Sequence, residues 1–234
     1  MAHAFRSVAS ATISGQTTGN KTLTITKPAG TVNDDVMVAI VSVLSVDAAL
    51  LTAPAGWTSL GSFSDANSKT EAFRKVAASE GASYAFTVSG GDPYAAAGII
   101  ASYSGVTLTP SPIDTDAEQS NAASTSATAP SVTPTGTADM LVCCYSSGST
   151  SYGVAVTSTP PSGMTERADA GIAQQDSSNY SWFDVQVSLN DVLLASAVAT
   201  GTKVATLSDA RANTGFAIAL SSAAGAAVGV HMVI

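Results

Sequence analysis

The chain repeats one series of short motifs in the same order in its two halves. A Pro-x-Gly-Thr turn and an aspartate lead into an aliphatic run at 36–41 and again at 140–144. The other landmarks recur downstream, and the matched pairs are Pro28–Thr31 with Pro134–Thr137, Pro54–Thr58 with Pro161–Thr165, Thr87–Ser89 with Thr206–Ser208, and Gly98–Ala101 with Gly215–Ile218. Four landmarks in one order predict an internal pseudo-repeat, which is typical of a scaffold built from a duplicated β unit.

Strand signals dominate between these landmarks. Residues 22–26 alternate between polar and apolar side chains, whereas 36–43 and 140–145 are the apolar runs expected of strands buried on both faces. Only 191–198 favours a short helix, with Asp191 near its N-terminus. The sequence therefore predicts an all-β fold, a jelly-roll or Ig-like β-sandwich with an internal pseudo-repeat.

The 234 residues divide into an arm, a duplicated core and a tail. We expect an N-terminal arm at 1–19 and a duplicated sandwich at 20–222, followed by an apolar tail at 223–234. Its halves, about 20–106 and 128–222, are joined by 107–127, whose Pro and Ser content indicates a loop or an extended edge. Two separate β-domains of about 100 residues are possible. We favour one interleaved sandwich, because the first half has few apolar residues to close its own core.

Charge and cysteine usage exclude several classes of protein. The net charge is −8, with nine basic residues and one adjacent basic pair, so a nucleic-acid or anionic-membrane binder is not expected. The N-terminus has no apolar signal region, and no run reaches the eighteen apolar residues of a membrane span. Cys143 and Cys144 are adjacent and would point to opposite strand faces, which predicts two reduced thiols and no metal site.

Candidate catalytic groups have simpler structural interpretations. The two histidines, His3 and His231, lie at the two ends of the sequence, which argues against a catalytic triad. The carboxylate pair Asp34-Asp35 has a counterpart in Asp139 at the same place in the repeat, so turn chemistry explains both. We therefore expect no enzyme and no cofactor.

Two further patterns leave a binding role open. Asp114, Asp116 and Glu118 alternate as calcium ligands do, but the turn glycine is missing, so a solvated acidic loop is favoured over a weak calcium site. Tyr180 and Trp182 lie two residues apart, hence on one strand face, and could contact carbohydrate. Trp57 opens a strand at a repeat landmark, which favours core packing.

The C-terminal tail is a candidate assembly contact. Residues 223–234 are apolar and carry no charge apart from His231, and such a segment is unusual for a soluble monomer. The side chains expected to dock on another subunit or on a shell, within a homotrimer, are Val228, Val230, Met232, Val233 and Ile234.

The order of the motifs resembles a group of β-sandwich proteins of tailed bacteriophages and prophages. The segments that match are Pro28–Gly30, Asp35–Val41, Pro54–Trp57, Arg74, Ser79–Thr87, Ala101–Val106 and Pro112–Asp114. The resemblance covers about 20–115 well and 128–221 loosely. It implies a capsid decoration, head-spike or tail-associated protein, and it supplies no catalytic residue.

On this basis we expect a structural virion protein, assembled in the host cytoplasm. A capsid decoration or cement protein, bound to the major capsid protein or to tail components, is the first hypothesis. The alternative is a carbohydrate-binding adhesin or receptor-binding module of the virion that recognises a host surface glycan. A glycan-active enzyme is the weaker third interpretation.

Overall fold

All regular elements of the described residues are β-strands. The computed structural model describes residues 3–14, 20–45, 50–64, 68–89, 93–150, 153–175 and 182–222, and these contain fourteen strands in antiparallel sheets. The all-β sandwich prediction is thereby confirmed. The strands are β1 (Ala4–Ser14), β2 (Lys21–Thr26), β3 (Val36–Ser45), β4 (Leu50–Thr52), β5 (Thr58–Ser64), β6 (Ser68–Val76), β7 (Ser83–Ser89), β8 (Pro93–Ser104), β9 (Ile113–Ala129), β10 (Met140–Ser149), β11 (Ser158–Thr159), β12 (Thr165–Gln175), β13 (Trp182–Leu193) and β14 (Lys203–Leu220).

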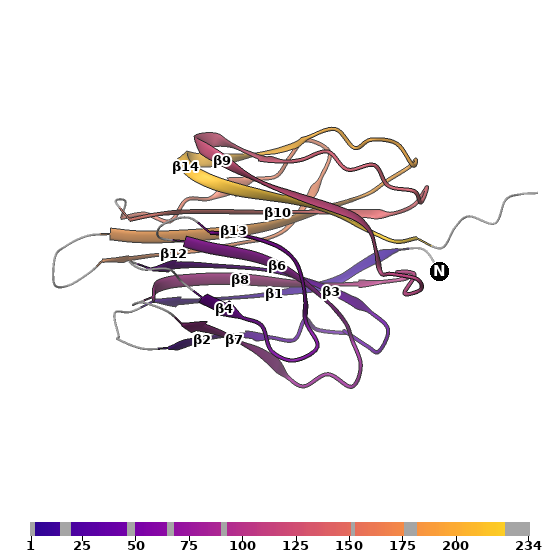
Figure 1. Ribbon diagram of the computed structural model, residues 1–234, viewed down its shortest axis with the longest axis horizontal. Helices are drawn as coiled ribbons and strands as arrows, with labels where there is room; N and C mark the ends of the chain where they lie inside the picture. The colour runs from indigo at the N-terminus through magenta and orange to yellow at the C-terminus, as the bar shows by residue number, and fades with distance from the viewer. Residues whose placement is uncertain are drawn as a thin grey trace, which may run out of the picture.

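The strands are stacked in layers (Figure 1). The order β1-β8-β3-β6-β5 forms the main sheet of the first half, and the small sheet β2-β7-β4 covers its outer side. In the second half, β14 lies between β9 and β10, and β10-β13-β12 continues the main sheet. The start of β14 pairs with β11 and with the end of β9, and these segments form the outer cover of that half. The two main sheets face each other.

Both halves use one strand order. The main sheet of the first half is β1-β8-β3-β6-β5, and the corresponding positions in the second are β9-β14-β10-β13-β12. The register agrees as well. Val36 of β3 pairs with Val76 of β6 and Tyr103 of β8. Met140, at the same place in β10, pairs with Leu193 of β13 and Leu220 of β14. This correspondence is what an internal repeat predicts.

The turns before β5 and β12 also correspond. Trp57 N–H donates to the Pro54 carbonyl at 3.4 Å, and Met164 N–H donates to the Pro161 carbonyl at 3.0 Å. Gly56 and Gly163 lie between them at φ +85° and +79°, a backbone conformation that glycine adopts without steric cost.

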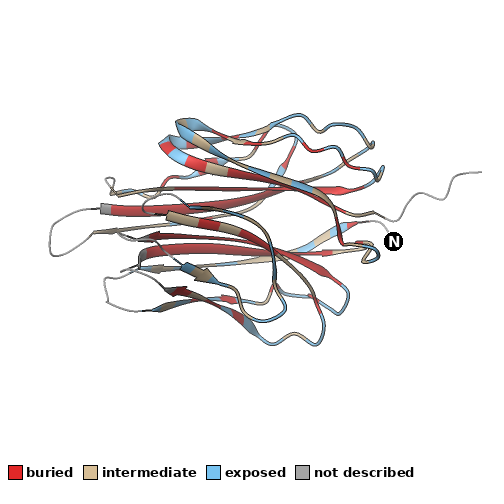
Figure 2. Cartoon of the chain, in the orientation of Figure 1, coloured by how far each residue is buried: buried red, intermediate tan, exposed pale blue. Residues whose placement is uncertain are grey.

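Three apolar cores hold the layers together (Figure 2). The central core lies between the two main sheets, and each half has a cover core beneath its outer layer. Alternate residues of β3 and β10 belong to different cores because successive side chains point to opposite faces. Those in the central core are Val36, Val38, Ile40, Met140, Val142 and Cys144, and those in the cover cores are Met37, Ala39, Val41, Leu141, Cys143 and Tyr145. The prediction of two strands buried on both faces is confirmed.

The two thiols follow this alternation. Cys144 lies in the central core and Cys143 in the second cover core, and both are free and buried. Burial raises the pKa of Cys143 to about 12 and that of Cys144 well above its usual value. The prediction of two unpaired thiols acting as small apolar side chains is confirmed.

Three segments differ from their sequence-based expectations. The expected arm contains β1, which pairs with β8 over its whole length and packs Ala9, Ala11 and Ile13 on the first cover core. The expected loop 107–127 contains most of β9, an edge strand on β14, so the extended-edge alternative is the right one. Both segments consist largely of small or polar residues, whose weak alternation hides a strand that long-range pairing stabilises.

The expected helix at 191–198 is wrong. Residues 191–193 instead end β13, where Asp191 pairs with Val142 of β10 and Thr165 of β12. The rest of the segment contains no helix. The extended backbone places the Asp191 carboxylate where it binds Arg167 and Tyr103. These contacts outweigh the helical propensity of this short segment.

A buried ionic network connects the two halves. Arg167 of β12 forms two contacts of 2.9 Å with the Asp191 carboxylate, and Tyr103 of β8 donates its hydroxyl to the same carboxylate at 3.0 Å. The guanidinium of Arg167 also lies 4.1 Å from the ring centre of Phe5 in β1. Burial, reinforced by the Asp191 charge, raises the pKa of Tyr103 well above its usual value, so this hydroxyl stays protonated and donates.

We predict that Tyr103→Phe lowers the free energy of unfolding by about 1.5–3 kcal/mol, because it removes a hydrogen bond to a buried charge. The measurement is urea denaturation of Tyr103→Phe, Asp191→Asn and the double variant. The network predicts that the double variant loses less than the sum of the two single losses. Additive losses would show that the hydroxyl and the carboxylate act independently.

Equivalent glycines of β8 and β14 lie beneath the cover strands. A Cβ on Gly98 would meet the side-chain tips of Ile25 and Leu23 at 2.7 and 2.9 Å. A Cβ on Gly215 would instead meet backbone atoms of Thr128 and Ala129 in β9. Side-chain tips can rotate away, whereas a paired strand backbone cannot.

Gly215→Ala is therefore expected to lower the free energy of unfolding by about 3 kcal/mol, and the matched variant Gly98→Ala by about 1 kcal/mol. Thermal and chemical denaturation of the two variants measure this difference. Equal losses, or a harmless Gly215→Ala, would contradict the close approach of β9 to β14.

Candidate functional site

One end of the central core is lined with hydroxyl groups. Ser42 of β3, Thr70 of β6 and Ser146 of β10 are buried, and their oxygens are 2.8–2.9 Å from one another. Each hydroxyl can donate and accept, so the three satisfy one another without a charge. The boundary between the two halves is thus apolar along most of its length, with this hydroxyl cluster at one end and the Tyr103–Asp191–Arg167 network toward the other.

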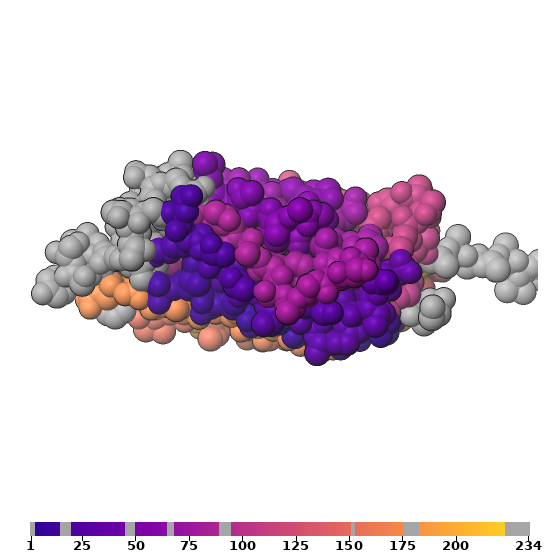
Figure 3. All heavy atoms as spheres, turned by 90° about the horizontal axis from the view of Figure 1, so that it is seen from below, coloured from indigo at the N-terminus to yellow at the C-terminus, as the bar shows by residue number. Residues whose placement is uncertain are grey.

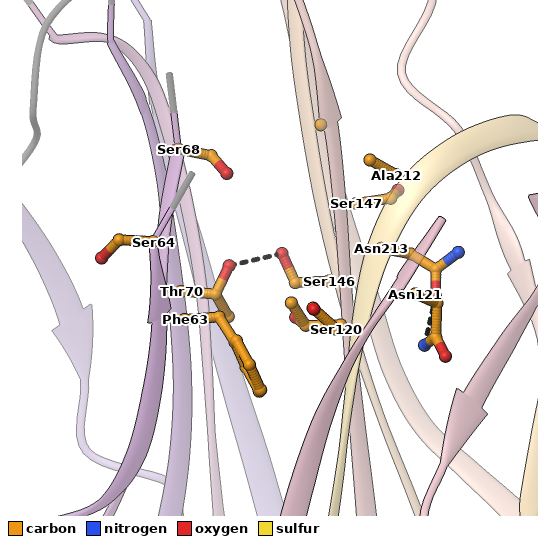
Figure 4. A pocket seen from close by; sticks show the side chains of 12 residues that line it. Phe63, Ser64, Ser68, Thr70, Ser120, Asn121, Ser146, Ser147, Ala212 and Asn213 are labelled. Carbon is orange, nitrogen blue, oxygen red and sulfur yellow. Dashed lines mark hydrogen bonds between the residues drawn. The ribbon is translucent and has the colours of Figure 1, made fainter. Parts of the chain in front are cut away.

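A pocket of about 210 Å³ opens beside this hydroxyl cluster (Figure 4). Its walls come from β5 and β6 of the first half and from β9, β10 and β14 of the second. None of the described residues that line it carries a charge. They are Phe63, Ser64, Ser68, Thr70, Ser120, Asn121, Ser146, Ser147, Gly148, Ala212, Asn213 and Thr214.

Amide groups on the second-half wall are held in fixed orientations. Asn121 Nδ2 donates to the Asn213 side-chain oxygen at 2.8 Å and to the Thr128 carbonyl at 3.0 Å. Gln119 donates to the Asn121 oxygen at 2.6 Å, and Asn213 donates to the Arg211 carbonyl. These bonds order the wall before any ligand arrives.

Two other lining residues offer free contact groups. Thr214 Oγ1 is buried and has no hydrogen-bond partner. The half-buried ring of Phe63 extends between the two walls in Figure 4, and its edge packs against Phe216 at a centroid separation of 6.2 Å. The pocket thus combines an unsatisfied hydroxyl with an aromatic surface.

A second polar cluster lies inside the second half. Asp184, Gln186, Ser188 and Asn190 alternate along β13, and all four are fully buried. Gln186 donates to Asp169 at 2.7 Å and accepts from Ser147. Sequence reasoning missed this cluster, because polar residues that alternate with apolar ones in a strand normally indicate a solvent-facing side.

Asp184 is the titratable group of this cluster. Burial raises its pKa to about 6, although Arg211, 3.6 Å from one carboxylate oxygen, favours the charged form. Arg211 also binds Asp209 at 2.8 Å, so its charge is shared between two carboxylates. The site can therefore take up a proton in mildly acidic conditions.

We predict a pH-dependent stability difference between the wild type and Asp184→Asn. The folded-state pKa lies above the ordinary value of 3.8, so the contribution of Asp184 is greatest below 3.8 and is lost as the pH rises through about 6. Relative to the variant, the wild type should lose roughly 3 kcal/mol across this window. Chemical denaturation from pH 4 to 7 measures the difference; a constant difference would show that Asp184 titrates normally.

The acidic segment around Asp114 forms a different cavity. Asp114 accepts hydrogen bonds from the Thr135 amide and hydroxyl at 2.5 and 2.6 Å, and both residues line a cavity of about 620 Å³ with Asp139. Burial acts to raise the pKa of Asp114, but the bonds from Thr135 outweigh it and hold this pKa below its usual value. No group of three or more possible metal ligands occurs in the described ranges, and Asp114, Asp116 and Glu118 lie in β9 rather than in a loop.

The aspartates before β3 and β10 act as expected of turn residues. Asp35 accepts from the Val32 amide at 2.9 Å and pairs with Arg6 at 2.6 Å. Asp139 accepts from the Ser222 amide at 2.7 Å. The backbone oxygens correspond too, since Asp35 accepts from the Ala77 amide and Asp139 from the Leu194 amide.

The structure separates the predicted aromatic residues. Trp57 packs against Tyr84 and Phe86 at centroid distances of 5.1 and 5.7 Å, which confirms its core role. Trp182 begins β13 opposite Gln175, but its side chain and all of Tyr180 lie outside the described residues. The same holds for the tail residues Val228, Val230, Met232, Val233 and Ile234.

Within the described segments no helix is long and apolar enough to cross a membrane. Comparison of the chain with protein-family models, with curated proteins and with solved structures finds no match.

Proposed function

We propose that this chain is a structural protein of a phage particle, of the capsid decoration type. The motif order supplies the phage context, and the surface of the folded chain supplies the physical support. Decoration requires a stable body with a face that can pack on other protein, and the layered sandwich has two such faces.

The observation that carries this proposal is the uncharged outer face of each cover. The outward positions of β2 and β7 are Thr22, Thr24, Thr26, Ser83, Ala85 and Thr87. Those of the second cover are Ser126, Thr128, Val204 and Thr206. Figure 3 shows the side of the first cover, where first-half atoms predominate. Soluble surfaces usually intersperse charges of both signs, whereas the centre of a protein interface is depleted of them.

We also propose that the scaffold arose by duplication of one β unit. Matching strand order, register and turns support a duplicated unit. In each half, a main sheet of five strands faces the other half and three shorter segments cover it, which supports a jelly-roll ancestry. Two similar cover faces would then present two similar docking surfaces.

Assembly into a homotrimer through the tail is the second part of the proposal. Residues 223–234 follow β14, and their aliphatic side chains would gain roughly 5–10 kcal/mol if buried on a neighbour, before ordering costs. Gly225 and Gly229 permit a close backbone approach, as in a strand added to a sheet edge.

The test of decoration uses purified particles of the encoding phage. We expect the protein in those particles by mass spectrometry, and we expect added protein to rebind particles that lack it. Thr24→Glu or Thr206→Glu should weaken this rebinding at least about tenfold, because each places a charge in an interface. Ser59→Glu, on the exposed side of β5, is the control. Absence from the particles, or rebinding that neither cover variant changes, would refute the proposal.

The tail prediction is tested by deletion of residues 224–234. We expect the truncated chain to sediment as a monomer and to bind particles more weakly, because the apolar contact is gone. Analytical ultracentrifugation gives the oligomeric state, and circular dichroism checks that the sheets remain. A truncated chain that keeps its oligomeric state would show that the tail only completes its own subunit.

A further inference from the structure

The uncharged pocket between the halves has the chemistry of a ligand site. We propose that it binds a neutral saccharide unit, a single pyranose ring or the end of a glycan. This goes beyond the proposed function, because decoration of a shell requires no small ligand. Neither Tyr180 nor Trp182 is among the described residues that line the pocket.

The lining chemistry selects the ligand class. Nine of the twelve described residues that line the pocket carry a hydroxyl or an amide, and none of these twelve carries a charge. A charged ligand would lose its hydration without gaining an ionic partner, and a wholly apolar ligand would leave the Thr214 hydroxyl unsatisfied. A neutral sugar presents groups that both donate and accept, which complements hydroxyls and amides.

The geometry supplies both kinds of contact that a pyranose makes. Asn121, Asn213 and Ser120 lie on the second-half wall, where the amides are held by their own hydrogen bonds. The Phe63 ring between the walls can pack against the C–H face of a sugar (Figure 4).

The unpartnered hydroxyl of Thr214 is the observation that points to a ligand. A buried hydroxyl without a partner costs free energy, and native structures rarely leave one unexplained. Donation to, or acceptance from, a sugar hydroxyl would satisfy it. Because the walls are paired strands from both halves, their backbones are ordered before a ligand binds.

Thr214→Val distinguishes an effect on ligand binding from an effect on the stability of the fold. The substitution keeps the shape of the side chain and removes only the unpartnered oxygen, so thermal stability should stay the same or rise. Binding should nevertheless weaken about tenfold, the loss expected for one hydrogen bond. Phe63→Ala should weaken binding through lost ring contact, and Thr165→Ala, at an exposed position of β12, is the matched control.

The experiment is saturation-transfer NMR on the full chain with the methyl glycosides of glucose, galactose, mannose and N-acetylglucosamine. We expect millimolar binding of at least one glycoside, weakened in Thr214→Val and Phe63→Ala and unchanged in Thr165→Ala. No binding of any glycoside overturns the proposal. Binding that survives both pocket variants, or that only Trp182→Ala abolishes, overturns it too. None of these outcomes bears on particle rebinding, so the decoration proposal is tested separately.

Discussion

The burial of β3 and β10 on both faces is the constraint on which the rest of the structure depends. A sheet whose central strand is apolar on both sides needs two covers. Each half supplies one cover from its own strands. In the first half this cover is β2-β7-β4, and in the second it is β11, the end of β9 and the start of β14. The other cover is the main sheet of the opposite half, since Val38 and Val142 both belong to the core between them. The two halves therefore stabilise each other.

This shared core explains where polar groups gather. The Tyr103–Asp191–Arg167 network and the hydroxyl cluster of Ser42, Thr70 and Ser146 both join residues of the two halves. Polar contacts at such a boundary fix how the two sheets sit on each other, because an offset would leave buried groups unpaired. The pocket beside the hydroxyl cluster is a product of the same boundary, since its walls come from both halves.

Sequence reasoning succeeded where local pattern and tertiary burial agree. Apolar content predicts the buried strands at 36–43 and 140–145 and the two buried thiols directly. Turn residues likewise predict the Pro-x-Gly turns. Sequence reasoning failed for β1 and left β9 open between a loop and an extended edge, because the small side chains of both strands carry little alternation. It also failed for the pocket, which brings Phe63 beside Asn121 and Asn213 through pairing across long sequence separations. The buried polar side of β13 had no signal at all, because only the fold decides that this side faces inward.

Native-state hydrogen exchange tests the shared core most directly. If the two halves form one cooperative unit, amides of β3 and β10 exchange only through global unfolding. Their opening free energies and denaturant dependences should then be equal. Peptide-resolved mass spectrometry across a denaturant series measures both strands in one sample. A β10 that opens at lower free energy while β3 stays protected would contradict the account, because the halves would then be two independent domains.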